Sequence, residues 1–291
     1  MVKILDGKQV AQALTQQVRE DVAALAERNI YPRLGIVRVG ERPDDISYER
    51  GALKRCEMAG IEAIQYLLPA DATQRTVIDL INRINQEETL HGCLIFRPMT
   101  TQISDAAVRA AVSSAKDIDG ITDGSLASVF TGASSGFAPC TAAACIAILD
   151  YYGIELTGKN VVVVGRSLVI GRPVAMLMMH KNATVTICHT KTANLPDICR
   201  SADILIAAAG KAETITADYC RPGQVVIDVG IHVKADGRLC GDVDFAAVSS
   251  IVEAITPVPG GVGAVTTSVL VKHTVSAARR QLLNDDLPLK V

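Results

Sequence analysis

Short runs of valine, isoleucine and leucine recur along this chain of 291 residues, with longer mixed segments between them. This alternation is typical of β-α units around a parallel sheet, whose strands are apolar on both faces because helices cover both sides. The strands expected from these runs cover residues 34–40, 63–68 and 93–97 in a first series, then 160–165, 183–188, 203–210, 224–230 and 253–256 in a second. The pattern predicts an α/β fold with two domains, since a single domain usually holds roughly 100–200 residues.

The boundary between the two series is expected in the stretch 116–141, which is rich in glycine, serine, aspartate and threonine and suits a boundary or the lining of a cleft. Helical patterns are expected at 73–86, 106–115 and 265–283. We therefore expect one domain at 1–139, joined by a C-terminal helix at 267–291, and a second domain at 140–266.

Composition excludes several classes of protein. A formal net charge of −2 and 49% hydrophobic residues argue against disorder and against a general nucleic-acid binder, and the absence of tryptophan disfavours stacking on single-stranded bases. The N-terminus lacks the apolar core of a signal peptide, and no stretch is long and apolar enough to span a membrane. Eight scattered cysteines without a C-x-x-C pair indicate reduced thiols in a cytoplasmic protein, with no disulfide framework and no metal site.

The segment "VVVVGRSLVIGRPVAMLM" (161–178) carries the strongest indication of chemistry. A buried strand ends at Gly165, and Gly171 precedes a helix, so backbone N–H groups and the helix N-terminus would face a phosphate. The spacing of the two glycines is neither the G-x-G-x-x-G fingerprint nor a P-loop. A purely structural β-α turn therefore stays open as an alternative.

The end of the next expected strand favours NADP over NAD. NAD enzymes usually carry an acid there, roughly 20 residues after the first glycine, for the ribose hydroxyls. This strand ends in His189-Thr190-Lys191-Thr192, with no acid, and Lys191 and Arg166 would welcome a 2′-phosphate. The alternative is a histidine bound to backbone and a solvated lysine.

A second glycine-rich loop, "TPVPGGVGAVT" (256–266), follows the last expected strand. Its prolines stiffen the loop and its glycines remove side chains, so that a flat ring could lie against it. Ligands of open α/β sheets bind at this end of the strands. A tight connection to the final helix is the alternative.

These motifs together identify a resemblance. "VVVVGRSLVIGRP", "TVTICHTKTANL", "VVIDVGI", "GDVDF" and "ITPVPGGVGAVT", with "ILDGKQVA", "KDIDG" and "PCT" before them, resemble the methylenetetrahydrofolate dehydrogenase/cyclohydrolase family over essentially the whole chain. The resemblance implies a homodimer in the cytoplasm. It also implies an N-terminal catalytic domain, a C-terminal Rossmann-like domain that binds NADP, and a tetrahydrofolate-type substrate in the cleft between them.

The resemblance also implies roles for individual residues. Those expected to bind NADP are Gly165, Arg166, Ser167, Gly171, Pro173, Thr190 and Ile231, the last beside the nicotinamide. Those expected to bind the folate are Tyr48, Asp119, Pro257, Gly260, Gly261 and Gly263. Tyr48 would stack on the folate and Asp119 would bind the pterin, and both are the expected catalytic residues.

The chain departs from the family in the helix that carries Tyr48. The family pattern is Tyr-x-x-x-Lys, with a lysine that acts in proton transfer, but this chain reads "YERGALK" and has Ala52 at that position. Lys54 lies about 200° around a helix from position 52 and does not replace the lost group. Arg55 falls nearly on the face of Tyr48, yet arginine stays protonated and cannot act as a base.

Further departures surround the same helix. Phe96 replaces the glutamine that supports the lysine, and Asp45 stands where a serine is usual. Ala142 and Ala264 replace prolines that follow "PCT" and "GGVG". The nucleotide half is thus largely intact, while the reacting side of the folate site has changed.

These departures predict which activity suffers. Hydride transfer from a carbon between two nitrogens needs mainly positioning, whereas hydrolysis of the methenyl bridge needs a tuned acid/base group, which contributes on the order of 10²–10⁴-fold. We expect a 5,10-methylenetetrahydrofolate dehydrogenase with weak or absent cyclohydrolase activity. Three alternatives stay open: a fully bifunctional enzyme, an NADP-dependent dehydrogenase of another amine-derived substrate, and a non-catalytic NADP- or folate-binding protein.

Overall fold

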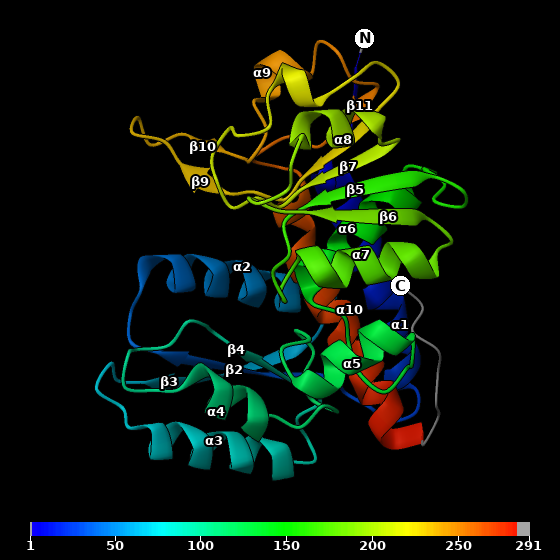
Figure 1. The fold of residues 1–291 in the computed structure, drawn as a ribbon. Coiled ribbons are helices and arrows are strands. Elements are labelled where there is room, and N and C mark those ends of the chain that lie inside the picture. Colours follow the sequence, from blue (N-terminus) through cyan, green and yellow to red (C-terminus); the bar gives the residue numbers. More distant parts are fainter. Residues whose placement is uncertain (1, 284–291) are drawn as a thin grey trace. The chain divides into compact units, whose positions relative to one another are not determined.

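The structure, a computed structural model, describes residues 2–283, which fall into two compact units. Within the described residues, unit 1 comprises 2–12 and 141–266, and unit 2 comprises 13–140 and 267–283. Each unit contains a parallel sheet with helices packed on it (Figure 1). The predicted α/β fold with two domains is confirmed.

Unit 2 contains a three-stranded parallel sheet in the order β3-β2-β4. Its elements are β2 (Arg33–Val39), α2 (Pro43–Ala59), β3 (Glu62–Leu68), α3 (Gln74–Gln86), β4 (Gly92–Ile95) and α4 (Asp105–Ala111). Helix α2 covers one face of the sheet, while α3 and α4 cover the other (Figure 1). Because β3 and β4 flank β2 on opposite sides, the carboxyl end of β2 is a topological switch point, where open sheets bind ligands.

The two faces of this sheet differ in chemistry. Val37, Val39 and Ile95 pack with Val77 and Ile81 of α3 in an apolar core. Side chains alternate along a strand, so residues 38 and 96 face the side that α2 covers. That side therefore presents Arg38 and Phe96 beneath the helix.

Unit 1 contains a six-stranded parallel sheet in the order β1-β11-β8-β7-β5-β6. Its strands are β1 (Lys3–Ile4), β5 (Asn160–Val164), β6 (Thr184–Cys188), β7 (Ile204–Ala207), β8 (Val225–Asp228) and β11 (Ala254–Ile255). The five strands predicted for the second series are all present, and β1 adds an edge by pairing with β11. A strand of two residues shows no periodicity, which is why the sequence did not reveal it.

The switch point of the larger sheet lies at β5, since β6 and β7 flank it on opposite sides.

The remaining elements are α1 (Gly7–Ala26), α5 (Asp123–Thr131), α6 (Cys140–Tyr151), α7 (Gly171–His180), α8 (Leu195–Ser201), η1 (Ala217–Tyr219), β9 (His232–Val233), β10 (Leu239–Cys240), α9 (Phe245–Val248) and α10 (Val262–Leu283). Helices α6 and α7 lie on one face of this sheet, and α8 and α9 on the other (Figure 1). No helix among residues 2–283 is long and apolar enough to cross a membrane.

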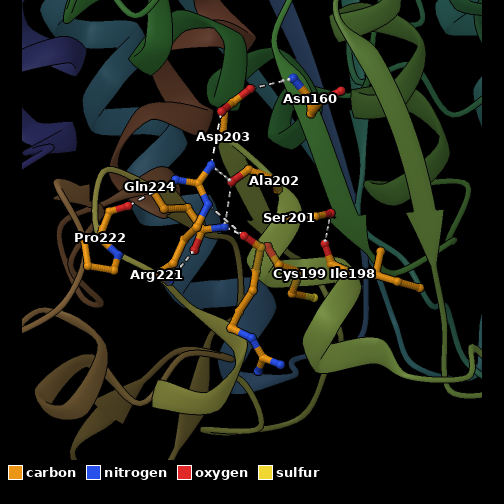
Figure 2. A network of polar contacts seen from close by, with 10 residues as sticks. Asn160, Ile198, Cys199, Ser201, Ala202, Asp203, Arg221, Pro222 and Gln224 are labelled. Atoms are coloured by element: carbon orange, nitrogen blue, oxygen red, sulfur yellow. Dashed lines mark hydrogen bonds and ion pairs between the residues drawn. The ribbon is translucent and has the colours of Figure 1, made fainter.

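A polar network fastens the amino ends of these strands (Figure 2). The Asp203 carboxylate accepts hydrogen bonds from the Asn160 backbone at 2.9 Å and from Arg221 at 3.2 Å, which links the starts of β5 and β7. Buried Gln224 donates to the carbonyl of Cys199 at 2.7 Å, near the end of α8. Helix-end carbonyls lack partners within the helix, so these bonds hold α8 in place and leave the carboxyl ends of the strands for function.

Helix α10 begins at Val262, three residues before the predicted start, and from Thr267 onward it belongs to unit 2. There His273 lies with its ring centroid 5.0 Å from that of Phe137, and Arg279 pairs with Asp21 at 3.0 Å. Residues 284–291 of the expected C-terminal helix lie outside the described residues.

Candidate functional site

The turn after β5 leaves no room for side chains at its two glycines. Gly165 has φ of +137°, and a Cβ there would lie 2.1 Å from the carbonyl oxygen of Ala208. A Cβ on Gly171 would lie 2.2 Å from the carbonyl oxygen of Gly165 itself. The strand end and the helix start therefore touch backbone to backbone, which only glycine permits.

The first turn of α7 fits a phosphate. No side chain caps this end of the helix, so its positive end is open to an anion. The Ser167 hydroxyl accepts a hydrogen bond from the backbone of Ile170 at 3.1 Å, and its own proton remains available to donate. Arg166 and Ser167 are exposed beside this turn, while Pro173 is buried. The residues present thus fit a nucleotide phosphate at the switch point of the sheet.

The end of β6 carries no acid to bind ribose hydroxyls. The His189 imidazole accepts a hydrogen bond at Nδ1 from the Lys191 backbone at 3.1 Å, and the His189 backbone donates to the Thr192 hydroxyl at 2.9 Å. His189 is therefore occupied within its own turn. Thr190 and Lys191 are exposed at this end of the strand.

Ile231 and the second glycine-rich loop line one cavity of about 260 Å³, together with Lys8 and the hairpin residue Leu239. Ile231 is 58% exposed, although its side chain is apolar. A Cβ on Gly263 would lie 2.9 Å from the Ile231 side chain, and a Cβ on Gly261 would lie 2.4 Å from the Pro257 carbonyl oxygen. The glycines thus let the loop approach Ile231 closely and keep the cavity open to a flat ring.

Two buried aspartates fix the loops around this cavity, and the sequence analysis assigned neither of them a role. The Asp228 carboxylate accepts three backbone N–H bonds of 2.9–3.0 Å, from Gly230, Asp242 and Val243. The Asp242 carboxylate accepts bonds from the Gly210 and Lys211 backbones and from His232 Nε2. Burial nonetheless raises the pKa of Asp228 to about 6. The motifs "IDVG" and "GDVDF" contained both residues, but only the structure shows that they join the two loops.

In unit 2, helix α2 presents a buried stripe to the sheet, formed by Asp45, Glu49, Ala52, Cys56 and Ala59. These positions repeat at the period of a helix, so they share one face. Ala52 is fully buried within it. Tyr48 lies beside the stripe and is half-buried, and its ring packs edge-to-face on Phe96 with centroids 5.9 Å apart.

A buried ion pair lies under the same helix. Arg38 Nε donates to Glu49 Oε2 at 2.9 Å, and Gln65 Nε2 donates to the other carboxylate oxygen at 3.0 Å. Arg38 also donates to the carbonyl of Gly40. The sequence analysis missed this network; its one signal was an arginine within an otherwise apolar strand.

Arg55 forms hydrogen bonds with two threonines. Its guanidinium donates to the Thr15 hydroxyl at 2.9 Å and to the Thr267 hydroxyl at 3.4 Å. These bonds hold it against α1 and α10, although its helical position falls near the face of Tyr48.

Asp119 lies just beyond Asp117, whose carboxylate accepts hydrogen bonds from the backbones of Ile121 and Thr122 immediately before α5. Burial raises the pKa of the Asp119 carboxyl to about 6, while a hydrogen bond from the Cys140 thiol and the charge of Arg97 oppose that rise. Since Arg97 follows Phe96, the structure gathers Tyr48, Phe96 and Asp119 around the end of β4. The described residues contain no group of His, Cys, Asp and Glu that could hold a metal.

A glycine turn between strand and helix at the switch point of a parallel sheet is the arrangement of dinucleotide-binding proteins, which hold a phosphate there. Comparison with protein families makes this specific. Residues 5–119 match the catalytic domain of tetrahydrofolate dehydrogenase/cyclohydrolase, and residues 139–282 match its NAD(P)-binding domain. The chain belongs to the tetrahydrofolate dehydrogenase/cyclohydrolase family. The resemblance seen in the sequence, and with it the expectation of a nicotinamide cofactor, is confirmed.

Individual relatives agree over nearly their full length. The bifunctional protein FolD of Carboxydothermus hydrogenoformans is 49% identical, over 98% of this chain and 99% of that protein. The crystal structure of bifunctional FolD from Campylobacter jejuni has a TM-score of 0.94 at 35% identity, over 97% of this chain and all of that one. The Trypanosoma brucei enzyme, solved with NADP and an inhibitor, has a TM-score of 0.89 at 34% identity, over 96% of this chain and 98% of that one.

Proposed function

We propose that this protein is an NADP-dependent 5,10-methylenetetrahydrofolate dehydrogenase of one-carbon metabolism whose methenyltetrahydrofolate cyclohydrolase activity is weak or absent. The observation that carries the second half of the proposal is the pair Ala52 and Phe96 beside Tyr48. Neither side chain can give or take a proton. The dehydrogenase half is supported by membership of the family and by the fit of the β5 turn to a nucleotide phosphate.

NADP, when bound, accepts the hydride. In our proposal Arg166, Ser167 and Thr190 contact the phosphate on its ribose, and Gly165, Gly171 and Pro173 shape the turn that approaches it. Ile231 lies beside the nicotinamide and excludes water from the reacting carbon. The NADP complex of the Trypanosoma brucei relative supports NADP as the cofactor.

On the folate side, Tyr48 stacks on the pterin and Asp119 accepts hydrogen bonds from its N–H groups. Pro257, Gly260, Gly261 and Gly263 border the folate. Hydride departure breaks one C–H bond of the bridging methylene, and a nitrogen lone pair then forms the C=N bond of the methenyl cation. This step requires the protein to position the bridging carbon, and these residues do so without transferring a proton.

Hydrolysis of the methenyl bridge requires proton transfer as well as positioning. Water must lose a proton and a nitrogen must gain one, so a positioned acid/base group is needed. Around Ala52, Glu49 has both carboxylate oxygens occupied by Arg38 and Gln65, and Arg55 is held by two threonines. Glu49 and Arg55 are thus fixed by their own partners, so neither takes the place of a lysine at position 52 in moving a proton.

Two assays on one preparation test the proposal. NADP⁺ and methylenetetrahydrofolate should yield NADPH, detected by its absorbance, while methenyltetrahydrofolate should decay at about the buffer rate. Methenyl hydrolysis well above that rate would contradict the loss of cyclohydrolase activity. Absence of NADPH formation would contradict the dehydrogenase itself.

A fully bifunctional enzyme is the second candidate, because the similar FolD proteins of Carboxydothermus hydrogenoformans and Campylobacter jejuni are bifunctional. The variant Ala52→Lys separates the candidates, with Gly51→Ala as a control on the exposed side of the same helix. A gain of hydrolysis in Ala52→Lys alone indicates that the missing lysine limits the native protein. Hydrolysis well above the buffer rate in native protein, and equal in both variants, would support the bifunctional candidate.

We also propose a cytoplasmic homodimer, on the strength of the family resemblance. Functionally, residues 1–139 with the helix from 267 would form the folate-side domain and residues 140–266 the NADP domain. Sedimentation of the native chain, whose mass is 30.8 kDa, should give about twice that mass. A monomer at micromolar concentration would contradict the dimer.

A further inference from the structure

Asp45 is a buried carboxylate without a hydrogen-bond donor among the described residues. Its side chain is only 10% exposed, and its nearest ionic partner, Arg42 Nε, lies 3.9 Å away. Arg42 is itself half-exposed and donates to the carbonyl of Pro98 at 2.8 Å. Burying a carboxylate without donors is costly, so this position is adapted either to a proton or to a positively charged ligand.

The other buried carboxylate on this face of α2 is already satisfied. Glu49 is matched by Arg38 and also receives the Gln65 amide, and Ala52 contributes no charge. Asp45 has only the 3.9 Å approach of half-exposed Arg42, so its charge is the less compensated of the two on this face. Burial raises the pKa of Asp45, an effect that Asp44 and Glu49 reinforce and that Arg42 and Arg38 oppose.

A role at the helix start does not explain Asp45 fully. An acidic residue in the first turn favours the helix dipole, but the neighbouring Asp44 supplies this while remaining exposed. Asp45 lies one helical turn before Tyr48, whose ring contacts Phe96. The buried carboxylate thus lies on the side of the helix where the aromatic surface for the pterin is expected.

We propose that Asp45 is a specificity-determining residue that recognises the positive charge of the amidinium-type methenyl bridge. This inference rests on the proposed dehydrogenase function, because hydride transfer creates that charge. A carboxylate at this place favours the cationic product over neutral folates and stabilises the charge as it develops. The Asp45 carboxylate would also slow the release of the methenyl product.

The test compares a cationic with a neutral ligand on the same protein at pH 7. Dissociation constants are measured by rapid-mixing titration for methenyltetrahydrofolate and for tetrahydrofolate, with native protein, Asp45→Asn and Asp44→Asn. We expect Asp45→Asn to raise the dissociation constant for methenyltetrahydrofolate about tenfold or more, as loss of a charge-assisted contact does. The dissociation constant for tetrahydrofolate should change less than about threefold. Asp44→Asn carries the same change of charge on the exposed side and should alter neither.

Equal weakening of both ligands by Asp45→Asn would show a merely structural role and overturn the inference, as would unchanged affinity for both. Loss of methenyl hydrolysis in Asp45→Asn, with the cation preference intact, would make Asp45 an acid/base group and also overturn it. Failure of native protein to reduce NADP⁺ with methylenetetrahydrofolate would instead overturn the proposed function. Thermal unfolding of Asp45→Asn checks the fold, and we expect no loss of stability because a buried charge has been removed.

Discussion

Asp119 shows how burial changes the working range of a single residue. A carboxyl of ordinary pKa near 4 is ionised throughout the physiological range, whereas burial raises the pKa of Asp119 to about 6. The Cys140 thiol, which donates to the carbonyl of Ile118 at 3.4 Å, also interacts with that carboxyl and limits the rise. In our proposal the ionised form accepts hydrogen bonds from the pterin, so protonation removes an acceptor from the site.

We expect kcat/KM for methylenetetrahydrofolate to fall as the pH drops through about 6 in native protein. The variant Asp119→Asn should show a low and flat profile over the same range. Removing the thiol in Cys140→Ala should move the midpoint to higher pH, because the bond that lowers the pKa is lost. Profiles of kcat/KM against pH for the three proteins check this, and an unmoved midpoint in Cys140→Ala would contradict it.

The same shift has a consequence for stability. Since the pKa of Asp119 is higher folded than unfolded, this residue makes folding less favourable as the pH rises from about 4 to about 6. Asp119→Asn should therefore unfold at a higher temperature than native protein at pH 7 and lose that advantage toward pH 4. Thermal unfolding at the two pH values measures the difference.

At the scale of elements, a strand and a helix are joined by a buried ion pair close to Tyr48. Arg38 at the end of β2 pairs with Glu49 of α2, and both are buried. Breaking such a pair by removing one partner costs about 3–5 kcal/mol, because the remaining charge stays buried. The fit of α2 on its sheet therefore depends on residues from both elements.

We expect Arg38→Met to lower the free energy of unfolding by about 3 kcal/mol or more, since Glu49 loses its cation. Ala52→Lys alone should cost about 1–3 kcal/mol because it overpacks a fully buried position. Position 52 lies one turn from Glu49, so the double variant should be more stable than the sum of the single losses predicts. Urea unfolding of native protein, the two single variants and the double variant gives the coupling free energy between positions 38 and 52. Simple additivity would contradict the idea that a lysine at position 52 can replace Arg38 as the cation of Glu49.

At the scale of the whole molecule, each unit contains its own sheet and core, and most of unit 1 lies within the match to the family's NAD(P)-binding domain. A ligand that binds only the folded state stabilises it by mass action, by about 2.7 kcal/mol at 100 times its dissociation constant. The midpoint of thermal unfolding is therefore a readout of cofactor choice that does not depend on catalysis.

We expect NADP to raise Tm by about 5 °C or more at such an excess, and NAD at the same concentration to raise it less. Arg166→Ala should reduce the difference between the two cofactors. Lys159→Ala, an exposed basic residue at the opposite end of β5, should leave the difference unchanged. Equal shifts with NADP and NAD in native protein would contradict the assignment of Arg166 to a ribose phosphate.

The order and type of most elements were readable from the sequence, because apolar runs at the strand period are a local property. The turn at Gly165 and Gly171 and the loop from Pro257 were readable for the same reason, since glycine and proline restrict the backbone wherever they occur. Ala52 was also visible in the sequence, as a departure from the pattern of the family that the chain resembles.

Only the tertiary structure decided which distant side chains meet. The pairing of Arg38 with Glu49, the bonds from Arg55 to Thr15 and Thr267, and the joining of two loops by Asp228 and Asp242 all depend on contacts across elements. A charged residue reads the same in a sequence whether it is solvated, paired or buried alone. Burial and the distance to a partner set its pKa and its chemistry, and both arise only when the chain has folded.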